Sequence, residues 1–383
     1  MGEGYMNKKI CIFNESISKS GGIERVTVNL ANMWVKKGYE VDILTISDGA
    51  PFYPLNEHVH VHSLHMTVKM GIKDQMMLFV SLIHRVRKFL KQHSYDYLIA
   101  IWTSRCIVSI LAARGLPVKV IACEHIAFDE TKSYFKKLRS MTYPYADAVV
   151  SLTDIDREKY KLLNKNSFTI PNAIDKDFLD IVADWSQSKI ILAVGRETPQ
   201  KGFDLLVDAW NKIVKKYPDW KVRIVGDNFT NKAYADLVLN KIHQYHLDNS
   251  IDIIPETQNI KDEYKKAAFY IMSSRYEGLP MVLLEAMATG MPAVSFDCPT
   301  GPRQIIKDGE TGLLVENGNI DALASAMEKM IKDSNMRIKM GGAGEEGYSP
   351  EVLRRICFHE VGKVIQYDSL IQYSYRGKLG ISA

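Results

Sequence analysis

Short apolar runs alternate with amphipathic segments along most of the chain. In the first half, runs rich in Val, Ile and Leu predict buried strands at 8–14, 40–46, 95–101, 118–125 and 147–153. The predicted helix over 23–37 carries apolar side chains at helical spacing, namely Val26, Leu30, Met33 and Trp34. Further amphipathic segments lie at 74–93, 104–115 and 130–143. Strands and helices that alternate at these lengths predict an α/β domain with a parallel, doubly wound sheet.

The alternation stops near 171–175 and starts again at residue 189. Strands are predicted at 189–196, 221–227, 251–256, 268–274 and 292–298, with helices over 203–217, 230–245 and 280–289. We therefore expect two α/β domains, over 1–173 and 174–365. Ser349 and Pro350 form a helix start signal, and a helix over about 366–383 is expected to pack back onto the first domain.

The charge of the chain is unevenly distributed. Its 383 residues have a formal net charge of +4, but residues 1–173 carry 23 Lys and Arg against 16 Asp and Glu, whereas residues 174–383 carry 26 against 29. A basic first half fits an anionic partner surface, and equally fits solvated helices. No apolar run reaches the ~18 residues of a membrane-spanning helix, and residues 1–13 lack the apolar core of a signal peptide. With five scattered cysteines and no C-x-x-C pair, we expect a cytoplasmic protein; attachment to the inner face of the cell membrane stays open.

Candidate binding residues lie where predicted strands end, which is where open α/β sheets bind ligands. Gly21 and Gly22 stand between the first strand and its helix, where backbone N–H groups can approach an anion. Their spacing is not that of the dinucleotide-binding G-x-G-x-x-G, and an ordinary turn is the alternative. Arg196 and Lys201 flank a turn that leads into a helix, so the two cations could neutralise a diphosphate. The alternative is two solvated loop cations.

Two glutamates bracket the start of the helix predicted over 280–289. Glu277 precedes a Gly-Leu-Pro turn, and Glu285 follows eight residues later, about two turns in. Carboxylates accept hydrogen bonds from sugar or ribose hydroxyls, and the backbone N–H groups of 278–281 would be free to bind phosphate or sugar oxygens. The alternatives are compensation of the helix dipole by Glu277 and a solvated helix position for Glu285.

Histidines occur in two contexts. His125 ends the predicted strand 118–125 and should reach the ligand-binding edge of the first sheet, although a lone histidine is more often structural. His58, His60 and His62 alternate along one strand face, with His65 beyond, a pattern that could form a metal site. No nearby carboxylate or cysteine completes that site in the sequence. We therefore interpret the segment as an edge strand with its polar face in water.

Together these residues resemble glycosyltransferase family 4, which has the GT-B architecture of two Rossmann-like domains facing a cleft. The resemblance covers nearly the whole chain. It is strongest in EGLPMVLLEAMATGMP (277–292), which carries the family's two glutamates separated by seven residues. The turn over 196–202 and the segments 170–175 and 309–319 also match.

The resemblance implies a role for each candidate residue. The donor nucleotide sugar would be bound by Gly22, Arg196, Lys201, Glu277, Gly278, Leu279, Pro280 and Glu285. Arg196 and Lys201 would bind the diphosphate, Glu277 the sugar hydroxyls, and Glu285 the ribose. His125 would contact the donor sugar, so the catalytic set would be His125, Glu277, Arg196 and Lys201, with Gly22 approaching from the first domain.

The implied reaction is retaining transfer of a hexose or N-acetylhexosamine from a nucleotide sugar, with UDP-sugar favoured, to a glycan acceptor. The segments 21–25 and 296–306 are most similar to bacterial enzymes that extend lipid-linked polysaccharide. GT-B enzymes need no metal bound to a D-x-D motif, and Asp154-Ile155-Asp156 opens a helix elsewhere, so no metal or other cofactor is expected. Two alternatives stay open: a UDP-sugar epimerase of similar fold, and a non-catalytic nucleotide-sugar-binding partner of a polysaccharide assembly complex.

A lipid-linked acceptor would require the first domain to reach the bilayer. Residues 79–91 and 132–139 mix basic and apolar side chains, and four apolar residues of the first segment share a helical face: Phe79, Ile83, Val86 and Leu90. Basic amphipathic segments of this kind can lie on anionic lipid. The alternative is that the apolar face packs on the sheet. No nucleic-acid partner is expected.

Overall fold

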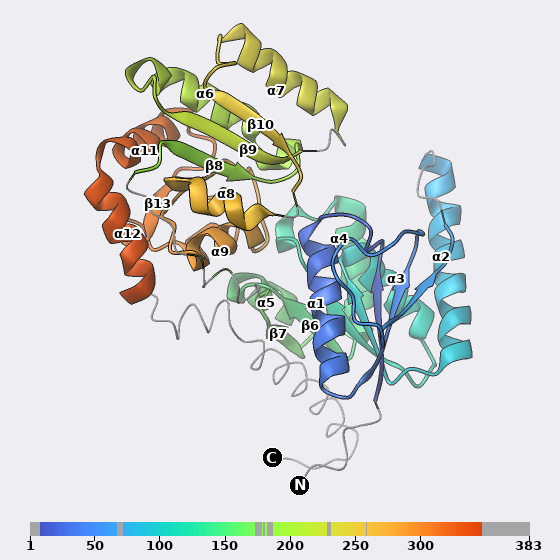
Figure 1. Ribbon diagram of the computed structural model, residues 1–383. Helices are drawn as coiled ribbons and strands as arrows, with labels where there is room; N and C mark the ends of the chain where they lie inside the picture. Colours follow the sequence, from blue (N-terminus) through green and yellow to red (C-terminus); the bar gives the residue numbers. More distant parts are fainter. Residues whose placement is uncertain are drawn as a thin grey trace. The chain divides into compact units, whose positions relative to one another are not determined.

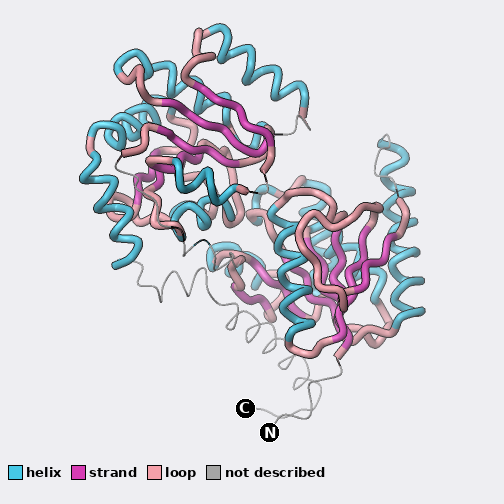
Figure 2. The backbone as a smooth tube through the Cα atoms, viewed as in Figure 1, coloured by secondary structure: helices cyan, strands magenta, loops and turns pink. Residues whose placement is uncertain are grey.

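The computed structural model describes residues 8–66, 72–172, 187–227, 231–257 and 259–346, together with Phe178 and Ile181. The chain divides into two compact units between Pro171 and Asn172, each an α/β unit built on its own sheet (Figures 1 and 2). The helix expected after Pro350 and the expected packing of 366–383 lie outside the described residues.

The first unit contains a seven-stranded sheet in the order β3-β2-β1-β4-β5-β6-β7. Its strands are β1 (Lys9–Asn14), β2 (Glu40–Thr45), β3 (His60–Ser63), β4 (Tyr97–Ile101), β5 (Lys119–Cys123), β6 (Ala148–Ser151) and β7 (Ser167–Thr169). Every neighbouring pair is parallel. The order of strands reverses between β1 and β4, and all the carboxyl ends lie at one edge of the sheet.

Helices cover both faces of this sheet (Figure 1). They are α1 (Gly22–Lys36), α2 (Ile72–His93), α3 (Thr103–Ala113), α4 (Ser133–Thr142) and α5 (Asp154–Lys161). In β1, Ile10 and Ile12 join the core beneath α1, whereas Cys11 and Phe13 join the core beneath α2 and α3. This alternation follows from the period of two along a strand. It explains the continuous apolar runs of the sequence, because both faces of each central strand are buried.

The apolar face of α2 packs on the sheet. Val86 and Leu90 are buried in the core of the first unit, and Phe79 and Ile83 pack against that core. The expectation that this face lies on a membrane is therefore wrong. Arg85 and Arg87 donate to backbone carbonyls of the same unit, at 3.0 Å and 2.7–2.8 Å. Lys88 and Lys91 are exposed. Within the described residues, no helix combines the length and apolar character that crossing a bilayer requires.

The second unit contains a six-stranded parallel sheet in the order β10-β9-β8-β11-β12-β13. Its strands are β8 (Ile190–Val194), β9 (Lys221–Asp227), β10 (Ile251–Pro255), β11 (Phe269–Met272), β12 (Ala293–Phe296) and β13 (Gly312–Val315). The order reverses between β8 and β11, as it does between β1 and β4 in the first unit. This is the doubly wound topology whose ligands bind at the reversal point.

The helices of the second unit are α6 (Phe203–Ile213), α7 (Lys232–Gln244), α8 (Ile260–Lys266), α9 (Met281–Ala288), α10 (Pro302–Ile305), α11 (Ile320–Lys332) and α12 (Ser334–Glu346). Residues of α6, α7 and α11 share one core cluster with the sheet, and α9 packs against β11 and β12. The predicted fold class, two parallel α/β sheets in tandem, is confirmed.

Candidate functional site

Two loops of the second unit interlock at the reversal point between β8 and β11. The first loop runs over 195–202 and the second over 273–280. Ser273 donates its hydroxyl to the carbonyl of Lys201 at 3.0 Å, and the Arg275 N–H donates to the carbonyl of Gln200 at 2.8 Å. Gly202 has a left-handed φ of +64°, and a Cβ there would lie 2.0 Å from the Ser273 carbonyl oxygen. Only glycine therefore allows the two loops to approach this closely.

Lys201 and Glu277 form an ion pair between these loops. The Lys201 Nζ lies 2.7 Å from Glu277 Oε1, and the side chains are 17% and 8% exposed. Ser274 donates to the same carboxylate oxygen at 2.8 Å, and Gln200 Nε2 lies 3.5 Å from the other oxygen. A Cβ at Gly195 would come within 3.0 Å of the Lys201 side chain, so this glycine leaves room for the lysine. The structure thus brings together two of the residues predicted from sequence.

A bidentate ion pair between Asp204, in the first turn of α6, and Arg275, in the second loop, also holds the two loops together. The two guanidinium nitrogens of Arg275 lie 2.9 Å and 2.7 Å from the carboxylate oxygens of Asp204, and Nη1 also donates to the carbonyl of Pro199. Burial raises the pKa of Asp204, but hydrogen bonds from Arg275 and Tyr234 outweigh burial and lower it overall. This pair could not be predicted from the sequence, because 71 residues separate its members.

Arg196 lies on the same loop as Lys201 and is exposed. Among the described residues, none forms a hydrogen bond or ion pair with its side chain. Its positive charge is therefore not neutralised within the described structure, in contrast to that of Lys201. An exposed guanidinium with five donors suits an anionic ligand.

A third loop, between β12 and α10, supports Glu277 and the turn that follows it. The Glu277 N–H donates to the Pro299 carbonyl at 2.8 Å, and the Thr300 N–H donates to the Glu277 carbonyl at 2.9 Å. The N–H groups of Gly278, Leu279 and Met281 have no acceptor within the described residues. Pro280 has no N–H, so the expected row of donors over 278–281 has a gap there. Three unused N–H groups at the start of α9 can bind oxygens of a ligand.

Glu285 is buried in α9 rather than solvated. It is 2% exposed, and the Tyr264 hydroxyl donates to its Oε2 at 3.2 Å. The alternative of a solvated helix glutamate is therefore wrong. Because α9 begins at Met281, Glu285 lies about one turn into the helix, not two as expected from sequence.

Cys298 lies near Glu277 but is not a nucleophile at neutral pH. Burial, with a further contribution from the negative charge of Glu277, raises the pKa of the Cys298 thiol to about 12. The thiol therefore stays protonated, and only the thiolate is reactive.

The first unit holds the two remaining predicted residues at the carboxyl edge of its sheet. Gly22 is the first residue of α1 and is exposed, and His125 lies two residues after the end of β5 and is partly buried. Gly21 adopts an ordinary φ of −71°, so this turn does not need glycine for its backbone conformation. A Cβ at Gly21 would lie 2.1 Å from a carboxylate oxygen of Glu24, a clash that the flexible Glu24 side chain can relieve by moving.

A buried polar network next to His125 was not predicted from sequence. Glu124 is 1% exposed and accepts hydrogen bonds from Thr103, at 2.7 Å, and from Tyr143. Burial raises the pKa of Glu124, although both hydrogen bonds oppose that rise. The polar residue directly before His125 was the available signal, and its burial could not be read from the sequence.

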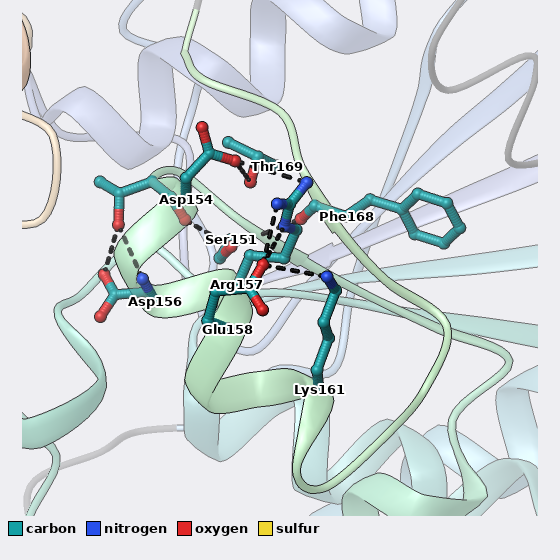
Figure 3. Close-up of polar contacts among 9 residues, drawn as sticks. Ser151, Asp154, Asp156, Arg157, Glu158, Lys161, Phe168 and Thr169 are labelled. Carbon is teal, nitrogen blue, oxygen red and sulfur yellow. Dashed lines mark hydrogen bonds and ion pairs between the residues drawn. The ribbon is translucent and has the colours of Figure 1, made fainter.

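The D-x-D at 154–156 has a structural role (Figure 3). Thr153 caps α5 by accepting the Asp156 N–H at 3.1 Å, and its hydroxyl donates to the Asp156 carboxylate at 2.9 Å. Asp154 accepts the Thr169 hydroxyl at 2.7 Å and lies 3.5 Å from Arg157. Asp154 is thus engaged by its own helix and by β7, whereas Asp156 is engaged by the capping Thr153 and by the Phe128 N–H, which donates to it at 3.0 Å.

His60 and His62 lie on the edge strand β3, as expected, whereas His58 and His65 lie outside it, and a carboxylate does lie beside the two strand histidines. Asp42 of β2 pairs in register with His60, and its oxygens lie 3.3 Å from His60 Nδ1 and 3.5 Å from His62 Nε2. The sequence concealed this neighbour, because strand pairing brings it from 18 residues away. Across the part of the chain that the structure describes, no group of three or more His, Cys, Asp or Glu is arranged to hold a metal ion.

Two family models of glycosyltransferases together match residues 20–347 of the chain. The model described as "Glycosyltransferase Family 4" matches residues 20–178, and the model "Glycosyl transferases group 1" matches residues 176–347. The chain is similar to the amylovoran biosynthesis glycosyltransferase AmsD of Erwinia amylovora, with 31% identity over 90% of this chain and 97% of that protein. It is also similar to an α-1,4-N-acetyl-D-galactosaminyltransferase of Campylobacter jejuni, named for a diNAcBac-PP-undecaprenol-linked substrate, with 29% identity over 83% of this chain and 88% of that protein.

Solved structures agree on the fold. Anabaena HepE, determined in complex with UDP and glucose, superposes with a TM-score of 0.79 at 17% identity, over 95% of this chain and 99% of that chain. At 17% identity, this structural similarity supports a shared fold and nothing further. The sequence relatives and the two parallel-sheet units lead to one conclusion: this chain belongs to the family 4 glycosyltransferases and has the GT-B architecture.

Proposed function

We propose that this chain is a retaining glycosyltransferase that transfers a hexose or N-acetylhexosamine from a UDP-sugar to a lipid-linked glycan during cell-surface polysaccharide biosynthesis. The observation that carries the proposal is the cluster of Arg196, Lys201 and Glu277 at the β8–β11 reversal point. It offers one exposed guanidinium, one ammonium–carboxylate pair and three unused N–H groups at the start of α9. A nucleoside diphosphate linked to a sugar needs this combination of cationic donors and carboxylate acceptors.

Each group has a role in the proposed reaction. Arg196 and Lys201 stabilise the diphosphate as it leaves, and the N–H groups of Gly278 and Leu279 contribute further donors. The Glu277 carboxylate accepts hydrogen bonds from hydroxyls of the donor sugar. No metal ion is required, because these fixed donors supply the positive potential that a divalent cation would otherwise supply.

Glu285 is assigned to the ribose, and residues of the first unit to the sugar. Tyr264 orients the Glu285 carboxylate, which can accept ribose hydroxyls. Gly22 and His125 approach the donor sugar, with His125 stabilising the transition state. A lipid-linked acceptor is supported by the name of the Campylobacter relative, and a UDP donor by the ligand of the Anabaena structure.

A donor screen tests this function. UDP-, GDP- and ADP-sugars are incubated with the chain, and release of the nucleoside diphosphate is measured with and without glycan acceptor. The proposal expects release from a UDP-sugar, stimulated by acceptor. Binding without release supports a non-catalytic nucleotide-sugar partner, and conversion of one UDP-sugar to another supports an epimerase.

Membrane contact follows from a lipid-linked acceptor and has its own test. Because the apolar face of α2 packs on the sheet, exposed cations of the two basic segments would have to provide the attraction, namely Lys88 and Lys91 of α2 and Lys132 and Lys137 of 132–139. A lysine near anionic lipid contributes about 1 kcal/mol to the binding free energy. Replacing both Lys88 and Lys91 by Ser should therefore weaken binding to phosphatidylglycerol vesicles about 30-fold at low salt. The matched control replaces Lys215 and Lys232, two exposed lysines of the second unit. Equal binding to neutral vesicles would reject the contact.

A further inference from the structure

A cavity of about 540 Å³ lies where β2 and β3 end, at the same edge of the first sheet as Gly22. Its lining includes Thr45, Asp48, His62, Ser63, Phe89 and His93, and we name it the histidine pocket. The proposed reaction makes no use of it. Its volume is within the range of small-molecule sites.

One wall of the histidine pocket is aromatic. The ring of Phe89 stacks on that of His93, with centroids 4.4 Å apart and planes at 30°. His62 lies 5.1 Å from Phe89 and 5.0 Å from His93, measured between centroids. Phe89 is 8% exposed, so the accessible ring atoms of this wall come from the partly buried His62 and His93, which can pack against apolar C–H groups of a ligand.

The rim of the histidine pocket is polar. Asp48 accepts from His65 Nδ1 at 2.6 Å, and the Ser63 hydroxyl accepts the His65 N–H at 3.0 Å. A hydrogen bond from Ser63, with a further contribution from His65, lowers the pKa of the Asp48 carboxyl, so this group is ionised at neutral pH and can accept hydroxyls. An aromatic wall with carboxylate and hydroxyl groups at its rim matches a sugar ring, which has apolar C–H faces and hydroxyls at its edge.

The charges around the histidine pocket are balanced. Asp42 lies beside both His60 and His62, and Asp48 lies beside His65. Burial lowers the pKa of His62 despite Asp42, which keeps the imidazole neutral at neutral pH. The residues that line the histidine pocket include no Lys or Arg, so the pocket offers no permanent cation to a phosphate or a uronate. A neutral, hydroxylated ligand fits better.

The histidine pocket adjoins the loop that leads to Gly22. Gly49, in the pocket's lining, has φ +149°, and a Cβ there would lie 2.5 Å from Cβ of Ser18, in the loop after β1. We propose that the histidine pocket binds a neutral sugar residue of the glycan acceptor, other than the residue that receives the donor sugar. This inference rests on the proposed function for the identity of the glycan, but the sugar site itself can be tested alone.

The test is binding of saccharides to the full chain, followed through the histidine ring protons by NMR. The neutral probes are chitotetraose and maltotetraose, and the charged probes are tetragalacturonate and inorganic pyrophosphate. A neutral probe should shift the resonances of His62 and His93. The variants His93→Ala and Asp48→Ala should weaken its binding at least tenfold, whereas the control His58→Ala, at a 74% exposed side chain outside the pocket, should change it less than twofold. Urea unfolding checks that each variant is folded.

Three results would overturn the inference: no neutral probe binds, a charged probe binds at these histidines instead, or the pocket variants bind like His58→Ala. UDP-sugar hydrolysis by the same preparation separates this inference from the proposed function. Saccharide binding without hydrolysis of any nucleotide sugar would contradict the proposed function and leave the sugar site standing. Hydrolysis of a UDP-sugar without saccharide binding would contradict the sugar site and leave the proposed function standing.

Discussion

Arg196 and Lys201 are expected to respond differently to the same substitution, because their surroundings differ. Both face the proposed diphosphate, so Arg196→Ala and Lys201→Ala should each lower turnover. By analogy with the loss of one oxyanion donor, each loss is on the order of 3 kcal/mol in the transition state, or about 100-fold in rate.

Folding stability should separate the two variants. Arg196 is exposed and has no ion pair within the described residues, so its replacement should change the free energy of unfolding by less than about 0.5 kcal/mol. Lys201 pairs with Glu277, whose side chain is 8% exposed. Lys201→Ala leaves that carboxylate with Ser274 and Gln200 alone, and should cost about 2 kcal/mol. The double variant Lys201→Met/Glu277→Gln should recover part of this loss.

Two assays are needed for these variants. Release of UDP from a UDP-sugar measures turnover, and urea unfolding measures stability. Lys215→Ala, at an exposed position of the second unit, is the control for loss of one positive charge. Near-normal turnover in both Arg196→Ala and Lys201→Ala would refute the diphosphate assignment. Equal stability of the two variants would refute the role given to the Lys201–Glu277 pair.

Three further predictions concern the same site. Asp204→Asn should lower the free energy of unfolding by about 1–2 kcal/mol at pH 7. Because Arg275 and Tyr234 lower the pKa of Asp204, the difference between the variant and the parent should persist down to about pH 4 and disappear as the pH falls through the lowered pKa of the folded state. Urea titrations at several pH values measure this difference. Glu277→Gln should lower kcat with UDP-sugar, whereas Glu285→Gln should chiefly weaken binding of UDP measured by calorimetry; equal loss of UDP affinity would contradict this division. Turnover should survive EDTA, and its abolition by EDTA with rescue by Mn²⁺ or Mg²⁺ would contradict metal-free departure of the diphosphate.

The hydrophobic pattern predicted the buried strands well, because parallel strands covered on both faces form continuous apolar runs. The hydrophobic pattern did not predict some short or strongly charged elements. The helix α8, with sequence IKDEYKK, has too few apolar positions to show a helical period. The strand β7 has three residues. Elements of this length carry little periodic signal.

Individual site residues could be predicted, but not their partners. Glu277 and Lys201 stand at strand ends in the sequence, yet their 2.7 Å contact joins residues 76 positions apart. Asp42 reaches His60 only through the register of β2 and β3. The burial of Glu285 depends on the packing of α9 over Tyr264, which no local pattern reveals. Such contacts arise from topology, and topology is not encoded in any one segment.

The reaction that we propose is retaining transfer from a UDP-sugar, with the diphosphate held by Arg196 and Lys201. The most direct measurement follows a UDP-α-sugar and an acceptor by time-resolved ¹H NMR in the presence of EDTA. We expect UDP to accumulate and the first product to carry an α-linked sugar. A β-linked first product, or no UDP from any UDP-sugar, would contradict it.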